Sequence, residues 1–218
     1  MSKYVKFTHE RARAEVTPFD RFAELNACRR KLLQLRLIGV DSNGTSFGNL
    51  SVRDGATRNF YITGSATGGV PDLTLADWTK VVACDFERNW VRYEGSTVPS
   101  SESLTHAAIY KSNAMAGAVI HCHDSTLWTA ILNQAPTSSK AVGYGAPEMA
   151  YEIMRLFKVS DAESRKILVM AGHEGGVVTF GRDVEEAFAV LMHEQTNHLL
   201  ALAALSTNVL LHDDEWIS

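Results

Sequence analysis

The spacing of apolar residues in the first half of the chain predicts a helix followed by several short strands. Apolar residues recur every three to four positions over 22–37, which predicts a helix that Gly39 would end. Alternating or short apolar runs bounded by turn residues predict strands. A polar loop within 41–53 runs into a short alternating strand, and further strands cover 59–63, 81–84 and 90–93, with a short helix at 73–78.

The second half continues this alternation and ends in a long helix. The pattern predicts helices at 102–112, 126–132, 147–157 and about 181–205, and strands at 118–123, 166–171 and 176–180. Asp183 and Glu186 have the spacing of a capping box at the start of the last helix. No linker separates these elements, so we expect a single α/β domain over 18–218, preceded by an N-terminal arm over 1–17.

Composition and charge are those of an ordinary globular protein. The chain has 218 residues, 45% of them hydrophobic, and can bury a core without disulfides, so we expect any metal to be catalytic. The net charge is −4, and the basic cluster 29–31 falls in the first helical pattern, where a solvated helix face explains it. The three cysteines form no CxxC pair, and no apolar stretch suits a signal core or a membrane span. We therefore expect a cytoplasmic protein with no nucleic-acid or membrane partner.

The first candidate metal site is His121-Cys122-His123, at the end of the strand predicted over 118–123. Residues two apart on a strand share a face, so both imidazoles can point toward one ion while Cys122 faces away. Imidazole is a good zinc ligand. The alternative is a pair of unrelated strand histidines, one packed in the core and one exposed.

A third ligand must come from elsewhere, and the spacing of the pair does not choose it. The other histidines are His9, His106, His173, His193, His198 and His212. His173 has glycine on both sides after a predicted strand, where backbone can approach a site closely, although an ordinary loop histidine also fits. His193 and His198 are five residues apart, about 140° around a helix, so they lack the shared face of a metalloprotease HExxH motif.

Glu102 follows Ser100 and Ser101 at a predicted helix start. The helix dipole alone favours a carboxylate there, and Glu102 is also a candidate general base. Free N–H groups at the helix start and the two serine hydroxyls suit a phosphate. The glycine-rich loops 44–49 and 64–69 are further phosphate-cradle candidates through their backbone N–H groups, or simply turns.

Taken in order, these motifs resemble the class II aldolase/adducin family over roughly residues 20–205. The motifs are Gly48-Asn49-Leu50-Ser51, Ser65-Ala66-Thr67-Gly68, Pro99-Ser100-Ser101-Glu102, His121-Cys122-His123 and Gly172-His173-Glu174-Gly175. Each motif is short, and it is their shared order that makes the resemblance specific. It implies a three-layer α/β/α sandwich around a central, mainly antiparallel sheet.

The resemblance also implies roles for individual residues. His121, His123 and His173 match the zinc ligands of the family, and Glu102 matches its catalytic acid/base. The matching phosphate-pocket residues are Gly48, Asn49, Ser65, Thr67, Gly68, Ser100 and Ser101. Family members are commonly homotetramers with active sites where subunits meet.

Two departures from the aldolase pattern concern the substrate. The first glycine loop, Gly44 to Asn49, is one residue longer than in the aldolases. The aldolases also use a tyrosine from the neighbouring subunit, whose place falls near Ala141. Tyr144, three residues further on, is the candidate to replace it.

The predicted function is that of a zinc-dependent aldolase-type lyase acting on a small sugar phosphate or related hydroxy-carbonyl compound. The metal would stabilise an enediolate as a Lewis acid, with Glu102 moving the proton. Imidazole sites also accept Mn²⁺, Co²⁺ or Fe²⁺. The alternatives are a pentose-phosphate 4-epimerase, a methylthio-sugar-phosphate dehydratase, or a non-catalytic adducin-like interaction domain. The Ser-Ser-Glu sequence favours the aldolase, and an interaction domain needs neither the histidines nor Glu102.

Overall fold

A central eight-stranded sheet organises the computed structural model, which describes residues 5–212. Its strand order is β1–β7–β6–β5–β4–β8–β10–β9, and neighbouring strands are antiparallel except for the parallel pair β1 and β7. The strands are β1 (Thr8–Arg11), β4 (Asn49–Arg53), β5 (Phe60–Thr63), β6 (Trp78–Asp85), β7 (Trp90–Glu94), β8 (Ala118–His123), β9 (Ile167–Val169) and β10 (Gly176–Gly181). A separate two-stranded sheet pairs β2 (Gly39–Val40) with β3 (Ser46–Phe47). The prediction of a mainly antiparallel sheet is confirmed.

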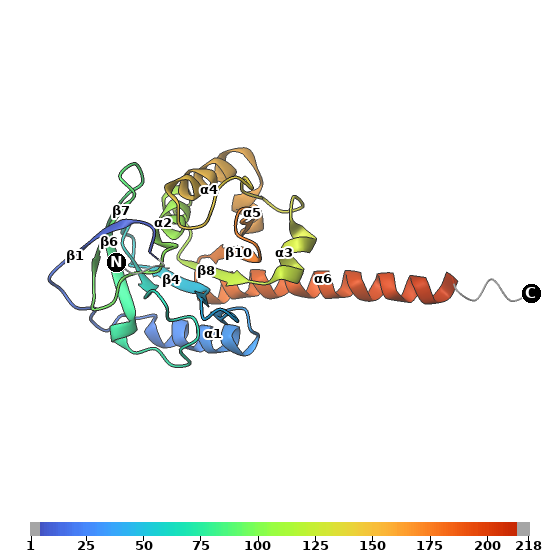
Figure 1. The fold of residues 1–218 in the computed structure, drawn as a ribbon, viewed down its shortest axis with the longest axis horizontal. Coiled ribbons are helices and arrows are strands. Elements are labelled where there is room, and N and C mark those ends of the chain that lie inside the picture. The colour runs from blue at the N-terminus through green and yellow to red at the C-terminus, as the bar shows by residue number, and fades with distance from the viewer. Residues whose placement is uncertain (1–4, 213–218) are drawn as a thin grey trace, which may run out of the picture.

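Helices cover both faces of this sheet (Figure 1). The helices are α1 (Phe22–Gln34), η1 (Leu75–Asp77), α2 (Ser103–Ser112), α3 (Ser125–Ile131), α4 (Pro147–Val159), α5 (Ala162–Arg165) and α6 (Val184–His212). One apolar cluster joins α1, α3 and α6 to the sheet, and a second joins α2, α4 and α5 to it. Because each helix buries its apolar side on the nearer face, the chain forms an α/β/α arrangement.

Strand β8 lies inside the sheet, between β4 and β10, and divides its side chains between the two clusters. Ile120 and Cys122 pack in the cluster of α1 and α6, whereas Val119 packs in the cluster of α2 and α4. His121 and His123 alternate with Ile120 and Cys122, so they lie on the side of α2 and α4. The strand register pairs His121 with Asn49 of β4, and His123 with the start of β10.

Several element boundaries differ from the sequence prediction. Helix α1 ends at Gln34 rather than at 37, because Arg36 has a positive φ of 59° and turns the chain toward β2. The N-terminal arm supplies β1, which pairs with β7. The capping box of α6 is only half formed: Asp183 accepts from the Glu186 N–H, but the Glu186 carboxylate accepts from the Arg182 N–H.

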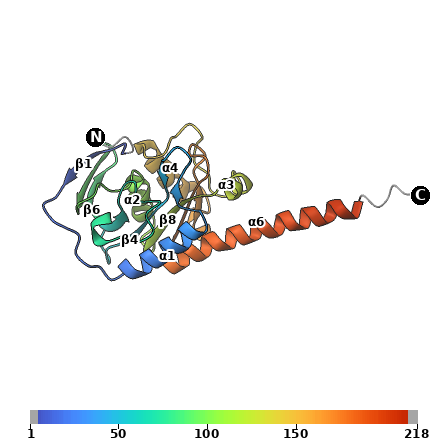
Figure 2. The same cartoon turned by 60° about the horizontal axis from the view of Figure 1, so that its bottom comes forward.

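The last helix, α6, continues well past the body of the protein (Figure 2). It was predicted to end near residue 205, and the structure extends it to His212. Leu199 and Leu200, in its projecting part, are both more than 60% exposed. Across residues 5–212, no helix combines the length and the apolar character needed to cross a membrane.

Gly117 provides a test of how tightly the start of β8 is held. A Cβ on Gly117 would lie 2.1 Å from the Arg182 carbonyl oxygen, a backbone atom that cannot rotate away. We expect Gly117→Ala to destabilise the protein by about 1–3 kcal/mol, measured by denaturant unfolding. Gly143→Ala is the matched control, because a Cβ there meets nothing within 4 Å. Equal stability of the two variants would contradict the packing described for β8.

Candidate active site

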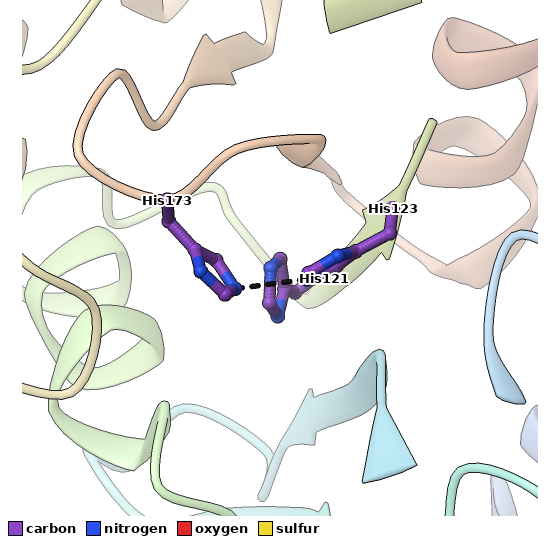
Figure 3. A group of neighbouring side chains, drawn as sticks. All are labelled: His121, His123 and His173. Atoms are coloured by element: carbon purple, nitrogen blue, oxygen red, sulfur yellow. Dashed lines mark hydrogen bonds between the residues drawn. The ribbon is translucent and has the colours of Figure 1, made fainter. Parts of the chain in front are cut away.

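Three histidines, two from a strand and one from a loop, converge at one point (Figure 3). His121 and His123 come from β8, and His173 comes from the loop between β9 and β10. One nitrogen from each ring lies within 4.8 Å of the others, and Nε2 of His123 is 2.8 Å from Nε2 of His173. This is the only such group of histidine, cysteine or carboxylate side chains found in the described part of the chain.

The glycines around His173 let its loop approach β8. Gly175 has a positive φ of 78°, which allows the chain to turn straight into β10. A Cβ on Gly172 would lie 1.8 Å from the Val142 carbonyl oxygen, so only glycine fits beside that segment. The loop is closed by a hydrogen bond from the Gly176 N–H to the His173 carbonyl at 2.8 Å.

Burial keeps all three imidazoles neutral at neutral pH. It lowers the pKa of His123 to about 4 and that of His173 to about 3, the latter with further contributions from His123 and Lys6. The pKa of His121 is lowered well below its usual value by burial first, and then by the neighbouring histidines. Neutral rings keep the lone pairs that a metal ion requires.

His121 has one ring nitrogen engaged and one open. The Asn49 side-chain amide lies 3.1 Å from Nδ1, and the buried Nε2 has no hydrogen-bond partner among the described residues. Turning the Asn49 amide group over would exchange the positions of its nitrogen and oxygen. Oδ1, which has no partner among the described residues as the amide now stands, would then accept a hydrogen bond from His121 Nδ1–H. That arrangement leaves the Nε2 lone pair for a metal, so the donor set fits a divalent ion such as zinc.

Glu102 lies immediately before α2 and is 2% exposed. Burial raises the pKa of its carboxyl group to about 7, although Thr105, Lys6 and the Gly145 backbone each act to lower it. Thr105 Oγ1 donates to Glu102 Oε2 at 2.7 Å, whereas Oε1 is buried without a partner among the described residues. The helix dipole alone would lower this pKa, so burial is the effect that sets the pKa of Glu102 above its usual value.

Nearly all residues predicted from the sequence to form a site line one pocket of about 340 Å³. Its lining includes Gly48, Asn49, Ser65, Thr67, Ser100, Ser101, Glu102, His121, His123, Tyr144 and His173. Gly68 is not part of the lining, and its N–H donates to Ser46 Oγ at 2.7 Å. Ser46 and Phe47, from the predicted loop 44–49, line the pocket, as does Asp41, which the sequence did not indicate.

Arg29 corrects one interpretation of the sequence. The cluster 29–31 was interpreted as a solvated helix face, but Arg29 is only 1% exposed. Its guanidinium donates to the carbonyls of Thr67, Gly68 and Val70, and so holds the second glycine-rich loop from behind. Burial lowers its pKa to about 10, which leaves it charged. Leu25 and Leu32, four positions before it and three after, form the buried stripe that contains it.

A second buried network lies behind His121. His106, one turn along α2 from Glu102, places Nδ1 2.7 Å from Ser51 Oγ, which lies 2.7 Å from the Tyr110 hydroxyl. Burial lowers the pKa of His106 to about 3, so it too is neutral. His193 lies apart from this region, on exposed α6, where its ring contacts Asn197 at 3.0 Å.

The fold is shared with solved structures of aldolases. L-fuculose 1-phosphate aldolase is 21% identical, over 88% of this chain and 89% of its own, with a TM-score of 0.64. A sugar-phosphate aldolase from Thermotoga maritima is 18% identical, over 85% and 95%, with a TM-score of 0.61. The N-terminal class II aldolase domain of a conserved protein from Thermoplasma acidophilum is 19% identical, over 87% and 98%, with a TM-score of 0.56. At these identities the likeness establishes the fold.

The family is established by the sequence match. None of the curated proteins compared with the chain matches it. Residues 27–202, most of the chain, match the family model described as the Class II Aldolase and Adducin N-terminal domain. This match covers every histidine and carboxylate of the pocket. The protein therefore belongs to the class II aldolase and adducin family.

Proposed function

We propose that the protein is a zinc-dependent aldolase-type lyase that breaks or forms a C–C bond in a small sugar phosphate or related hydroxy-carbonyl compound. The observation that carries this proposal is the convergence in one pocket of three neutral imidazoles and a buried carboxylate oxygen to which no described residue donates a hydrogen bond. The family and the aldolase folds of the similar structures support it. An adducin-like interaction domain has no use for this combination.

His121, His123 and His173 would hold the ion. A divalent metal bound there supplies Lewis-acid stabilisation of negative charge that develops on substrate oxygens. The three ligands are neutral, so they leave the charge of the ion undiminished. Asn49 orients His121 through Nδ1, as supporting residues do in metal sites.

Glu102 moves the proton in the proposed reaction. Its Oε2 is held by Thr105, so Oε1 is the atom that can exchange a proton with the substrate. In the synthetic direction Oε1 accepts the proton from the carbon beside the carbonyl, and in cleavage it returns that proton. A pKa of about 7 suits a group that must do both near neutral pH.

The remaining pocket residues position the substrate. Thr67, Ser100 and Ser101 present hydroxyls and backbone groups near the start of α2. We propose that they bind the substrate phosphate together with the other phosphate-pocket residues named from the family resemblance. The Tyr144 ring also lines the pocket, and it packs 4.4 Å from the His173 ring. We assign Tyr144 the contact to the aldehyde part of the substrate. The family resemblance also leads us to propose a cytoplasmic homotetramer.

Metal content provides the first test. We expect the purified protein to bind one divalent ion per chain, and His121→Ala to weaken metal affinity by at least about tenfold, measured by elemental analysis after dialysis. His193→Ala is the control, since that exposed histidine lies on α6. A wild-type protein without stoichiometric metal after zinc loading would refute the proposal.

Replacement of Glu102 tests its role separately. We expect Glu102→Gln to lower retro-aldol turnover by about 10²-fold or more while metal content stays unchanged, because the amide cannot carry the proton. Turnover would be screened over phosphorylated and free hydroxy-carbonyl compounds. Glu148→Gln, at an exposed position in the first turn of α4, is the control. Loss of metal from Glu102→Gln would assign the residue to metal binding instead.

The raised pKa of Glu102 predicts a pH dependence of stability in the metal-free protein. Between about pH 4.5 and 7 the folded state keeps a proton that the unfolded state has released, so wild-type stability falls as pH rises through this window. Glu102→Gln cannot ionise and escapes this loss. We therefore expect the variant to gain stability relative to wild type between pH 5 and pH 8, by on the order of 3 kcal/mol in denaturant unfolding. A constant difference across this range would contradict the burial argument.

A further inference from the structure

Lys6 lies beside the pocket although it comes from the N-terminal segment. The backbone that follows it is fixed by the sheet and the core. Phe7 is buried in the cluster of α2 and α4, and β1 begins at Thr8 and pairs with β7. The Asn89 side-chain amide also donates to the Lys6 carbonyl oxygen at 2.8 Å. The position of Lys6 therefore follows from the sheet.

The Lys6 side chain extends over Tyr144. Its Nζ lies 3.3 Å from the centre of the Tyr144 ring and donates to the Tyr144 carbonyl oxygen at 2.9 Å. Gly145 makes room for it, since a Cβ there would lie 3.3 Å from Lys6 Cδ and 3.2 Å from the Ser101 carbonyl oxygen. The ammonium group is thus held against Tyr144, which packs on His173, and Gly145 brings this segment close to Ser101.

The charge of Lys6 reaches the site. The positive charge of Lys6 lowers the pKa of the Glu102 carboxyl group. Only burial and the Thr105 hydrogen bond have larger effects on this pKa. Tyr144 lines the pocket, so the contact of Lys6 Nζ with the Tyr144 ring places the ammonium group at the edge of the pocket.

Apart from the proposed metal, the pocket offers an anion little positive charge. Among the described residues, its lining contains no lysine or arginine, and it includes the carboxyl groups of Asp41 and Glu102. Arg29 is turned toward the carbonyls behind the second glycine loop. The cradle therefore presents only hydroxyls and backbone groups to an anion, and a phosphate is bound far better when a cation is in reach.

We propose that Lys6 binds the anionic group of the substrate, a phosphate or a carboxylate, at the edge of the pocket between Tyr144 and Ser101. This proposal rests on the proposed function, which it deepens by naming the residue that selects an anionic substrate. One of the three ammonium hydrogens is used by the Tyr144 carbonyl and the group also faces the Tyr144 ring, so at least one hydrogen remains for the ligand. Lys6 lies outside the stretch 27–202 that matches the family model.

The test uses metal-loaded full-length protein and titrates inorganic phosphate and succinate as separate probes by calorimetry. We expect Lys6→Met to weaken binding of the anion by about tenfold, the usual scale of one charge-assisted hydrogen bond, with metal content and melting temperature unchanged. Lys6→Arg should restore most of the affinity. Lys158→Met, at an exposed lysine in the last turn of α4, is the matched control and should bind as wild type does.

The outcomes separate this proposal from the proposed function. A phosphate-only loss in Lys6→Met assigns the contact to a phosphate, and a succinate-only loss assigns it to a carboxylate. Equal binding of both probes to wild type and Lys6→Met would overturn the role of Lys6 while leaving the cradle intact. If wild type binds neither probe, the Lys6 proposal and the phosphate cradle both fail, and the metal and Glu102 assignments stand or fall on their own variants.

Discussion

The two-residue period of β8, inside a sheet covered on both faces, is the constraint on which the site depends. Neighbouring strands fix the register of β8 on each side, pairing His121 with Asn49 and His123 with Gly176. A slip by one residue would place Cys122 in the pocket and both histidines in the core of α1 and α6. The apolar packing that fixes this register therefore also fixes the position of two of the three imidazoles.

The same burial that orders these groups also sets their protonation. Removal from water disfavours a charged form, so the pKa of each histidine falls while that of Glu102 rises. The histidines thereby become suitable metal ligands, and the carboxyl group becomes able to hold a proton near neutral pH. Buried atoms that have no hydrogen-bond partner within residues 5–212, such as His121 Nε2 and Glu102 Oε1, cost stability, and such local costs are typical of functional sites.

The sequence predicts the elements that have a clear period, and it misses contacts that depend on distant segments. Strand β8 has the predicted limits because an apolar run is bounded by turn residues. Helix α1 is shorter than predicted because Arg36 adopts a left-handed conformation that periodicity does not reveal. Arg29 has the helical spacing from Leu25 and Leu32 that predicts a place on the buried face of α1. The charged residues next to it in the sequence indicated an exposed face instead. No local pattern could place Lys6 beside Tyr144, 138 residues away.

Charge balance links the parts of the site to one another. Without a metal, the neutral histidines and a Glu102 that readily keeps its proton leave the pocket with little positive charge of its own. A divalent charge held by His121, His123 and His173 would lower the energy of an ionised carboxylate nearby, so a bound ion would favour the basic form of Glu102 further. Lys6 acts on Glu102 in the same direction from the open side of the pocket. Burial thus sets the resting state of the carboxyl group, and the charges that assemble around it determine when it gives up its proton.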